Sequence, residues 1–443
     1  MSFTDTIYAL ASGRGRAGVA VVRISGPGAV ASLEGMTGKT APDPRVASLR
    51  NLYRSSNKSV IDQSLVILFK GPESFTGEDV VELHLHGGPA ILAAVMEELS
   101  GFPGHRPAMP GEFTRRAFEH GKMDLTEAEG LGDLVNAETE AQATQALRQM
   151  QGELGRIYEG WRSALVSSLA HLEADIDFPD EDLPGGVAAA VAPKVALLKK
   201  EIIDHLSDGH RGEKIREGLD VVILGRPNVG KSSLLNALAR RDAAIVSDEA
   251  GTTRDIIEVP MDLAGYPVTI VDTAGLRLSD NRIEREGVRR ARERAARADI
   301  RLFMTTADAP MIPDEFADLL QDGDYRLVNK TDLVVEKPET ETAPRLFPLS
   351  VMAGEGLDAL LAELEMDVTN RLDLSGAPAL TRVRHRQALE ECAAALERFD
   401  GSMEPELAAE DIRLAVRALG RITGRIDVED VLDVIFGDFC IGK

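Results

Sequence analysis

The sequence has 443 residues, of which 44% are hydrophobic and 28% charged, a composition that indicates a soluble globular protein of roughly two to four domains. No apolar stretch approaches the roughly 18 residues of a membrane helix, the N-terminal residues lack the order of a secretory signal, and two cysteines are too few for a disulfide framework, so we expect a cytoplasmic protein. The formal net charge of −23 argues against a general polyanion binder, although a local basic patch could still meet a nucleic acid.

Residues 1–119 predict an α+β domain of short strands. Runs rich in β-branched and aliphatic residues, bounded by glycine and proline, mark strands at 19–25, 64–69 and 80–86. A helix is expected over 89–100, because proline is favoured in the first turn and apolar residues follow.

The strand at 80–86 carries three polar residues on one face, since side chains alternate along a strand: Glu82, His84 and His86. Two histidines at this spacing could hold a metal ion, but no further ligand cluster stands nearby. We therefore interpret them as polar residues on a half-solvated strand.

Residues 120–217 predict the first part of a helical bundle. Thr126 and Glu129 match a capping box, so a long helical pattern is expected to begin there. Apolar residues recur every three or four positions over 147–176, and a second helix is expected over 193–207.

The sequence VVILGRPNVGKSS at 221–233 predicts a phosphate-binding loop. An apolar run of strand length leads into the pattern G-x-x-x-x-G-K-S, and the LLNAL stretch after it has helical spacing. Backbone N–H groups of such a loop bind phosphate oxygens. Lys231 is expected to reach the terminal phosphates, and Ser232 to ligate Mg²⁺.

Three further motifs of an α/β domain at 218–371 complete a nucleotide site. Thr253 in AGTTRD is the expected second Mg²⁺ ligand, and Asp272 and Gly275 in DTAG are expected near the Mg²⁺ waters and the γ-phosphate. Asp332 in NKTD can accept hydrogen bonds from the N1–H and the 2-amino group of guanine, which adenine lacks. Four motifs in this order predict that the nucleotide is GTP.

The residue after Gly275 bears on the mechanism of hydrolysis. It is Leu276, whereas Ras-type enzymes have a glutamine there that orients the attacking water. Another group must therefore place the water, and the candidates are Asp280, Glu284 and Glu286. No arginine is evidently a cis finger, because Arg254 and Arg277 could equally be surface charges.

The charge that develops between the β- and γ-phosphates could be neutralised by a monovalent cation. Asn228, in the phosphate loop, has a side-chain oxygen suited to such a hard ion. It could equally be only a turn residue.

Arginines are dense over 282–301 and are interleaved with glutamates. This pattern favours a salt-bridged surface helix, with contact to RNA as the less favoured interpretation. Residues 372–443 become helical again, which predicts that the α/β domain is inserted into a helical bundle.

Several motifs together resemble one family. They are DTIYALAS, VVRISG, FTGEDVVELHLHGG, PGEFTRRAFEHGKMDLTEAE, GRPNVGKSSLLNAL, AGTTRD, DTAGLR, NKTD and the terminal FCIGK. The chain resembles the bacterial tRNA modification GTPases called MnmE or TrmE over essentially its whole length. The N-terminal strings and FCIGK are the specific ones, since many GTPases share the phosphate loop and NKTD.

The resemblance implies a multidomain architecture. Its parts are an N-terminal α+β folate-binding and dimerisation domain (1–119), an α-helical bundle domain (120–217 and 372–443) and an inserted Ras-like α/β G domain of the P-loop NTPase class (218–371).

The resemblance also implies a K⁺-stimulated GTPase that is a homodimer and acts with the FAD-dependent flavoprotein MnmG. Together they add an aminomethyl or carboxymethylaminomethyl group to C5 of the wobble uridine (U34) of certain tRNAs. The carbon comes from a tetrahydrofolate derivative, 5-formyl- or 5,10-methylene-tetrahydrofolate.

Matching motif positions assigns roles to individual residues. Folate contacts fall to Arg23, Glu82, Lys122 and Lys443. The resemblance assigns the positioning of the attacking water to Glu284, the expected catalytic residue. Mg²⁺ falls to Ser232 and Thr253, and K⁺ falls to Asn228, Ser247, Glu249 and Thr252. The expected GTP contacts are Asn228, Val229, Gly230, Lys231, Ser232, Ser233, Ser247, Asp248, Glu249, Ala250, Gly251, Thr252, Thr253, Asp272, Thr273, Ala274, Gly275, Asn329, Lys330, Asp332, Ser350 and Val351.

The chain departs from the usual patterns at two places. Ser350-Val351 stands where most GTPases have Ser-Ala, and His84 is not part of the family pattern. Cys440 matches a family cysteine near the folate pocket, and two roles stay open for it: covalent chemistry at uridine C5, or a buried, inert thiol.

Two other functions remain as alternatives. One is a ribosome-assembly or signalling GTPase that acts as a binding module with an accessory N-terminal domain. The other is a folate-dependent methyltransferase acting alone, which would need no GTPase domain. Folate binding separates the expected function from the first of them.

Overall fold

The chain divides into two units, the first comprising residues 1–132, 149–192 and 398–443, and the second residues 133–148 and 193–397. A computed structural model describes residues 4–177, 187–240, 257–272, 281–334, 345–373, 376, 378–426, 429–437, 439 and 442, without the side chains of 257, 281–287 and 429–431. Within these ranges, no helix has both the length and the apolar character that a membrane span requires.

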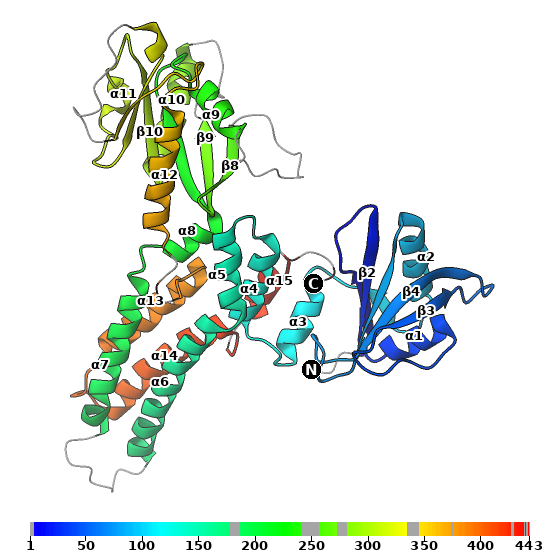
Figure 1. Ribbon diagram of the computed structural model, residues 1–443. Coiled ribbons are helices and arrows are strands. Elements are labelled where there is room, and N and C mark those ends of the chain that lie inside the picture. Colours follow the sequence, from blue (N-terminus) through cyan, green and yellow to red (C-terminus); the bar gives the residue numbers. More distant parts are fainter. Residues whose placement is uncertain are drawn as a thin grey trace. The chain divides into compact units, whose positions relative to one another are not determined.

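The N-terminal part of the first unit is a sheet with helices α1 and α2 on one face (Figure 1). The strand order is β3-β4-β5-β2-β1-β6, and neighbours are antiparallel except for β1 and β6. The elements are β1 (Thr6–Leu10), β2 (Ala17–Ser25), α1 (Ala29–Thr37), β3 (Ser48–Tyr53), β4 (Val60–Phe69), β5 (Val80–Gly87), α2 (Pro89–Ser100) and β6 (His105–Pro107). The three predicted strands and the predicted helix are confirmed as β2, β4, β5 and α2.

The opposite face of this sheet carries both polar and exposed apolar side chains. Arg23 of β2 lies opposite Glu82 of β5, and the next row across the sheet joins Val21, His84, Leu65 and Leu49. Leu49 is 61% exposed and Leu65 is 39% exposed. The helix α3 (Glu112–Glu119) follows β6, and its Phe113 is fully buried against Ile7 and Ala9 of β1.

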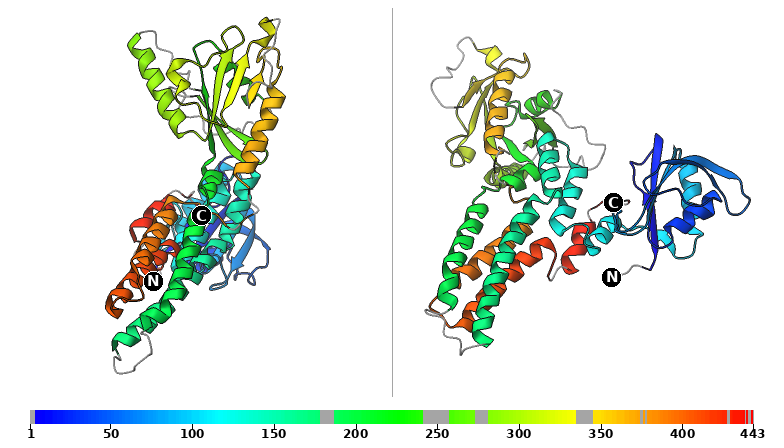
Figure 2. Two further views of the ribbon diagram at one scale, coloured as in Figure 1. Left: turned by 90° about the vertical axis from the view of Figure 1, so that its left-hand side faces the viewer. Right: turned by 60° about the horizontal axis from the view of Figure 1, so that its bottom comes forward.

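The first unit also contains α4 (Leu125–Asn136), which continues into the second unit, α6 (Glu153–Asp177), α14 (Pro405–Thr423) and α15 (Glu429–Gly437). Helices α6 and α14 lie side by side (Figure 2). They contribute buried side chains that include Leu165, Leu172, Ile412 and Leu419.

The predicted capping box of the first helix was wrong, because the observed one lies two residues earlier in the sequence. Asp124 and Glu127 form the reciprocal cap, since the Glu127 N–H donates to Asp124 Oδ1 (2.9 Å) and the Asp124 N–H donates to Glu127 Oε2 (2.7 Å). Thr126 and Glu129 are instead buried within α4.

The apolar pattern over 147–176 belongs to two helices rather than one. Helix α5 (Glu140–Met150) ends before Gly152, which has a left-handed φ of 79°, and α6 begins at Glu153. The next helix, α7, spans Val187–Leu206 and so begins earlier than the predicted 193, with Pro193 inside it.

The second unit contains a sheet with the strand order β12-β11-β10-β7-β9-β8, in which only the pair β8 and β9 is antiparallel. Its strands are β7 (Leu219–Leu224), β8 (Ile257–Leu263), β9 (Tyr266–Asp272), β10 (Ile300–Thr306), β11 (Tyr325–Asn329) and β12 (Leu346–Pro348). The helices around it are α8 (Arg211–Glu217), α9 (Lys231–Ala239), α10 (Asn281–Arg297), α11 (Asp314–Ala317), the 3₁₀ helix η1 (Thr331–Leu333) and α12 (Leu357–Arg371).

Each face of this sheet has its own core, so the predicted α/β domain is confirmed and has three layers. One core contains Leu234 of α9 and Leu360 of α12, and the other contains Ala291 and Ala295 of α10 with Phe316 of α11. The carboxyl ends of the parallel strands meet at one edge, the place where open α/β sheets bind ligands.

The helix α13 (Val383–Arg398) follows the α/β domain in the sequence, and ion pairs join it to the segment that precedes that domain. Arg386 of α13 pairs with Asp208 at 2.8 Å and with Glu213 of α8 at 3.1 Å. Helix α5 also contacts the α/β domain, because Ala141 is buried in its core and donates its N–H to the Gly265 carbonyl.

Candidate functional site

The loop between β7 and α9 has the geometry expected of a phosphate-binding loop. Gly225 and Gly230 have φ values of 152° and 110°, which residues other than glycine rarely adopt. A Cβ at Gly225 would lie 2.2 Å from the Met304 carbonyl oxygen, and a Cβ at Gly230 would lie 2.4 Å from Asn329 Nδ2. Both glycines are therefore required by backbone conformation and by close neighbours.

Lys231 and Ser232 open helix α9 and point to different partners. Lys231 is 5% exposed, and its Nζ donates to the carbonyl oxygens of Gly225 (2.7 Å) and Arg226 (2.9 Å). Burial lowers the pKa of Lys231, although the charge of Asp272 opposes the shift. Ser232 Oγ donates to Asp272 Oδ2 at 2.6 Å, so the two oxygens that the sequence assigns to the surroundings of Mg²⁺ lie together.

Asn329 of NKTD contacts both the phosphate loop and the loop at Ser350-Val351, which is expected at the guanine base. Its Nδ2 donates to the Val229 carbonyl (2.7 Å), and its Oδ1 accepts from the Val351 N–H (3.1 Å). Lys330 Nζ donates to the Asn228 carbonyl at 3.0 Å. Asn228 has a left-handed φ of 65° and is therefore a turn residue. The backbone conformation does not test whether the side-chain oxygen also binds a cation.

The remaining base-side residues follow at the ends of β11 and β12. Asp332 lies exposed in η1, and Ser350 is fully buried, with its Oγ accepting from the Ala353 N–H at 3.2 Å. Ser233 is exposed on α9. The described parts of three of the four predicted motifs, the phosphate loop, DTAG and NKTD, thus come together at the carboxyl edge of one sheet, whereas AGTTRD lies outside the described residues.

Several predicted residues lie outside the described part of the chain. They are Ser247, Asp248, Glu249, Ala250, Gly251, Thr252, Thr253, Thr273, Ala274, Gly275, Cys440 and Lys443, together with Arg254, Leu276, Arg277 and Asp280. The backbone of Glu284 lies in α10, but its side chain is not among those described. The predictions for these residues stay predictions.

A second candidate site is a cavity of about 380 Å³ in the N-terminal domain. Its lining is cationic at Arg23, Arg45 and Lys122, acidic at Glu73 and Glu82, aromatic at Phe69 and Phe75, and completed by Ser74 and Val80. The volume falls within the range of about 300–1,000 Å³ typical of small-molecule sites. Three of the residues that the family resemblance assigns to folate therefore share one cavity.

Arg23 and Glu82 form the centre of this cavity. Arg23 Nε and Nη2 both donate to Glu82 Oε1, at 3.1 and 2.9 Å. The guanidinium carbon lies 5.5 Å from the ring centroid of Phe75 and 5.8 Å from that of Phe113, within the range of cation–π contact. Lys122 Nζ donates to the Pro72 carbonyl at 2.9 Å, so its ammonium group is held at the cavity wall.

Sequence reasoning missed the aromatic residues around Arg23 and the third cationic residue of the cavity. Phe75 and Phe113 lie in the strings FTGED and GEFTRR, and only their position below Arg23 distinguishes them from ordinary core residues. Arg45 was also missed, and its guanidinium lies 5.7 Å from the ring centroid of Phe69. The signal was present only as a grouping of aromatic and basic residues far apart in sequence.

The histidines of β5 have acidic neighbours. His84 Nε2 lies 3.4 Å from Glu82 Oε2, and His86 Nδ1 lies 2.7 Å from Asp62 Oδ1. Among the described residues, no group of three His, Cys, Asp or Glu is arranged to hold a metal ion.

Described arginines of 282–301 pair with acidic residues of the same α/β domain. The pairs are Arg289–Glu293, Arg292–Asp318, Arg294–Asp220, Arg294–Glu258 and Arg301–Asp324. The pairs of Arg289, Arg292 and Arg294 confirm the interpretation of a salt-bridged surface helix for the described side chains of α10, whereas Arg301 lies in β10.

The chain matches two protein-family models and is similar to known proteins over nearly its whole length. Residues 6–122 match the model of the GTP-binding protein TrmE N-terminus, and residues 125–440 match the model of the MnmE helical domain. The chain is 54% identical to the tRNA modification GTPase MnmE of Parvibaculum lavamentivorans, over 99% of this chain and all of that protein. It is also 54% identical to the MnmE of Rhodospirillum rubrum, over 99% of each chain.

A more distant relative is found in a eukaryote. The chain is 47% identical to a mitochondrial 5-taurinomethyluridine tRNA synthase subunit, GTPB3, of Danio rerio, over 99% of this chain and 93% of that protein.

Proposed function

The chain belongs to the MnmE (TrmE) family of tRNA modification GTPases, and we propose that it couples GTP hydrolysis to a one-carbon modification of tRNA. It is a GTP hydrolase of tRNA modification. The finer proposal is that, with the flavoprotein MnmG, it adds an aminomethyl or carboxymethylaminomethyl group to C5 of the wobble uridine U34. A tetrahydrofolate derivative would supply the carbon.

The described residues of the G domain suit GTP and Mg²⁺. The Ser232 hydroxyl and the Asp272 carboxylate are hard oxygen donors 2.6 Å apart at the start of α9, the type of group that Mg²⁺ prefers. Lys231 is held in the loop by two carbonyls, from which it can turn to phosphate oxygens. We further propose that Glu284 positions the attacking water and that Thr253 completes the Mg²⁺ site.

The proposal that K⁺ stimulates hydrolysis rests on the phosphate loop and the segment after it. K⁺ bound there would neutralise charge between the β- and γ-phosphates. Asn228 lies in the loop, and the other proposed ligands are Ser247, Glu249 and Thr252.

One observation carries the folate proposal: the cavity that brings Arg23, Glu82 and Lys122 together. A folate has a flat ring system with N–H donors and a tail with carboxylates. Glu82 can accept from the ring donors, the aromatic side chains can contact its face, and the cationic side chains can pair with the tail. We propose that Lys443 also contacts the ligand, since its neighbour Gly442 packs closely against the Leu10 carbonyl.

The proposed partners are a second copy of the chain, MnmG and tRNA, in the cytoplasm. The face of the N-terminal sheet opposite α1 and α2 supports the homodimer, because the paired Leu49 and Leu65 leave an exposed apolar strip there. Such a strip is typical of a surface that another protein covers.

Titration of 5-formyltetrahydrofolate into the protein tests the proposed function. We expect wild type to bind and Arg23→Ala to bind about ten- to a hundredfold more weakly, because a charged hydrogen bond contributes about 1.5–3 kcal/mol. Arg54→Ala is a matched control, since Arg54 pairs with Glu97 on the surface of the same domain. If wild type fails to bind, the ribosome-assembly or signalling GTPase becomes the better hypothesis.

A further inference from the structure

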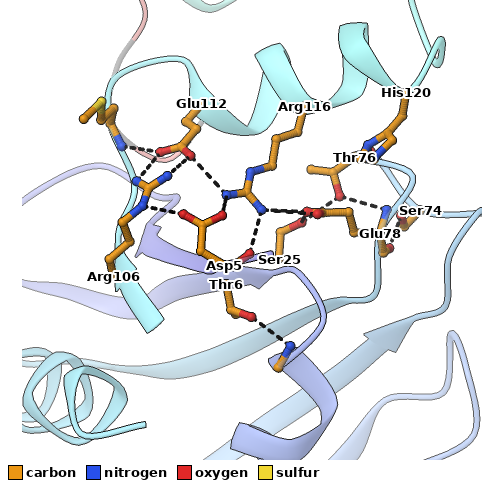
Figure 3. A network of polar contacts seen from close by, with 12 residues as sticks. Asp5, Thr6, Ser25, Ser74, Thr76, Glu78, Arg106, Glu112, Arg116 and His120 are labelled. Atoms are coloured by element: carbon orange, nitrogen blue, oxygen red, sulfur yellow. Dashed lines mark hydrogen bonds and ion pairs between the residues drawn. The ribbon is translucent and has the colours of Figure 1, made fainter. Parts of the chain in front are cut away.

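Arg116 of α3 is the largest fully buried side chain of the described residues, and it does not line the cavity. Figure 3 shows its polar contacts. Its Nη2 donates to Asp5 Oδ1 (2.8 Å) and Glu112 Oε1 (3.1 Å). Its Nη1 donates to the Asp5 carbonyl (3.1 Å) and to both carboxylate oxygens of Glu78, at 3.1 and 3.2 Å. One guanidinium thus links α3 to the chain before β1 and to the chain before β5.

Glu78 belongs to the loop over residues 71–79, which joins β4 to β5, and it makes further contacts within that loop. Its Oε2 accepts from Ser25 Oγ at 2.7 Å, and Ser25 Oγ lies 2.7 Å from Thr76 Oγ1. The Glu78 carbonyl accepts from Ser74 Oγ. Ser25 and Thr76 are fully buried, so a polar network holds the loop from within, in addition to the apolar packing of Phe75 against the cluster that contains Phe113.

The end of α3 supplies a second anchor for the same loop. His120 Nδ1 lies 2.7 Å from the Thr76 carbonyl oxygen (Figure 3). Gly77 has a φ of 82°, and a Cβ there would lie 3.0 Å from the His120 Cβ. The loop therefore approaches α3 closely at its centre.

This loop is a wall of the N-terminal cavity. Glu73, Ser74 and Phe75 line the cavity, and the rings of Phe75 and of Phe113 in α3 both lie within cation–π distance of the Arg23 guanidinium. The helix that carries Arg116 therefore also supplies part of the support for Arg23.

We propose that Arg116 is a positioning residue of the cavity: through Glu78 it holds the 71–79 loop so that Phe75 and Ser74 face Arg23. The identity of the ligand in this inference rests on the proposed function. The geometry of the loop is independent of that function. Lysine cannot replace arginine here, because a single ammonium group cannot serve Glu78 and the Asp5–Glu112 side at once.

Hydrogen exchange of the ligand-free full-length protein tests the inference about the loop. Arg116→Lys and Glu78→Gln are expected to raise amide exchange in peptides covering 71–79. Arg106→Lys is the matched control, since Arg106 pairs with the same two carboxylates, Asp5 and Glu112, but not with Glu78. Equal exchange in the three variants and wild type would overturn the inference. Glu78→Gln keeps it testable if Arg116→Lys does not fold.

Calorimetric titration of 5-formyltetrahydrofolate then tests the effect on the cavity. A purely structural defect lowers the fraction of competent protein and thus the stoichiometry, whereas misplacement of the wall raises Kd. We expect Kd to rise on the order of tenfold in Arg116→Lys and Glu78→Gln, without additivity in the double variant, and to stay unchanged in Arg106→Lys. Unchanged Kd in the first two variants overturns the inference alone. Absence of binding to wild type overturns the proposed function and, with it, the role of Arg116 toward that ligand.

Discussion

Replacement of Asn329 by alanine is expected to destabilise the G domain even when no nucleotide is bound. Asn329 is 4% exposed and bridges the Val229 carbonyl and the Val351 N–H. Each hydrogen bond contributes about 1 kcal/mol net, so the loss of both is expected to lower the free energy of unfolding by about 2 kcal/mol. With a urea dependence of about 2 kcal/mol per molar, the midpoint would fall by about 1 M.

The measurement is amide exchange of peptides covering β7 in a urea series, which reports on the sheet of the G domain. Asp332→Ala is the control, because Asp332 is exposed in η1 and its loss is expected to change stability by less than about 0.5 kcal/mol. That variant should instead weaken the binding of GDP. A wild-type midpoint for Asn329→Ala would refute the view that this side chain holds the loops together.

Three further outcomes are expected. Glu284→Ala should keep its affinity for GTP and lose most of kcat, because only the transition state needs the positioned water; unchanged turnover would exclude this role. Exchange of K⁺ for Na⁺ at constant ionic strength should slow GTP hydrolysis, and equal rates in the two salts would contradict a K⁺ site. Burial raises the pKa of Cys392 to about 12, so this thiol should not react with a disulfide reagent at pH 8 until urea unfolds α13. Thiol titration with and without urea measures the difference, and modification of Cys392 in the native protein would show that the helix opens.

The nucleotide site was predictable because its signals are local. Gly225, Gly230 and Lys231 occur within seven consecutive residues, and the loop that they form is dictated by backbone conformation. The order of strands and helices around it follows from apolar runs of strand length separated by helical patterns. Even here the bridging contacts of Asn329 were not predictable, because a motif specifies residue types and not the neighbours that a side chain reaches across 100 residues.

The helix boundaries were less predictable, for a physical reason that the cap of α4 illustrates. Asp124, Thr126, Glu127 and Glu129 offer two overlapping capping patterns, and both Asp and Thr are favoured N-cap residues. The observed one leaves Thr126 and Glu129 to be buried, where Gln149 Nε2 donates to the Thr126 carbonyl at 2.9 Å. Tertiary contacts therefore decide between two local patterns, and no single stretch of sequence contains that information.

The residues that support the cavity were much less predictable from the sequence than those of the phosphate loop. The cavity wall combines residues of β2, β4, β5, the 71–79 loop and the chain after α3, together with Arg45. The buried Arg116 joins α3 to that loop and to the chain before β1 through partners 38 and 111 residues away in sequence. A buried arginine is stable only with all its carboxylates in place, since removal of one partner leaves an uncompensated charge. Arg116 in TRRAF looks in sequence like one more surface charge on an amphipathic helix, and only the assembled fold distinguishes it from Arg115, which is partly exposed and pairs with Glu119 and Asp433. For this site, therefore, the family resemblance could identify ligand contacts, while the residues that hold those contacts in place become evident only from the three-dimensional arrangement.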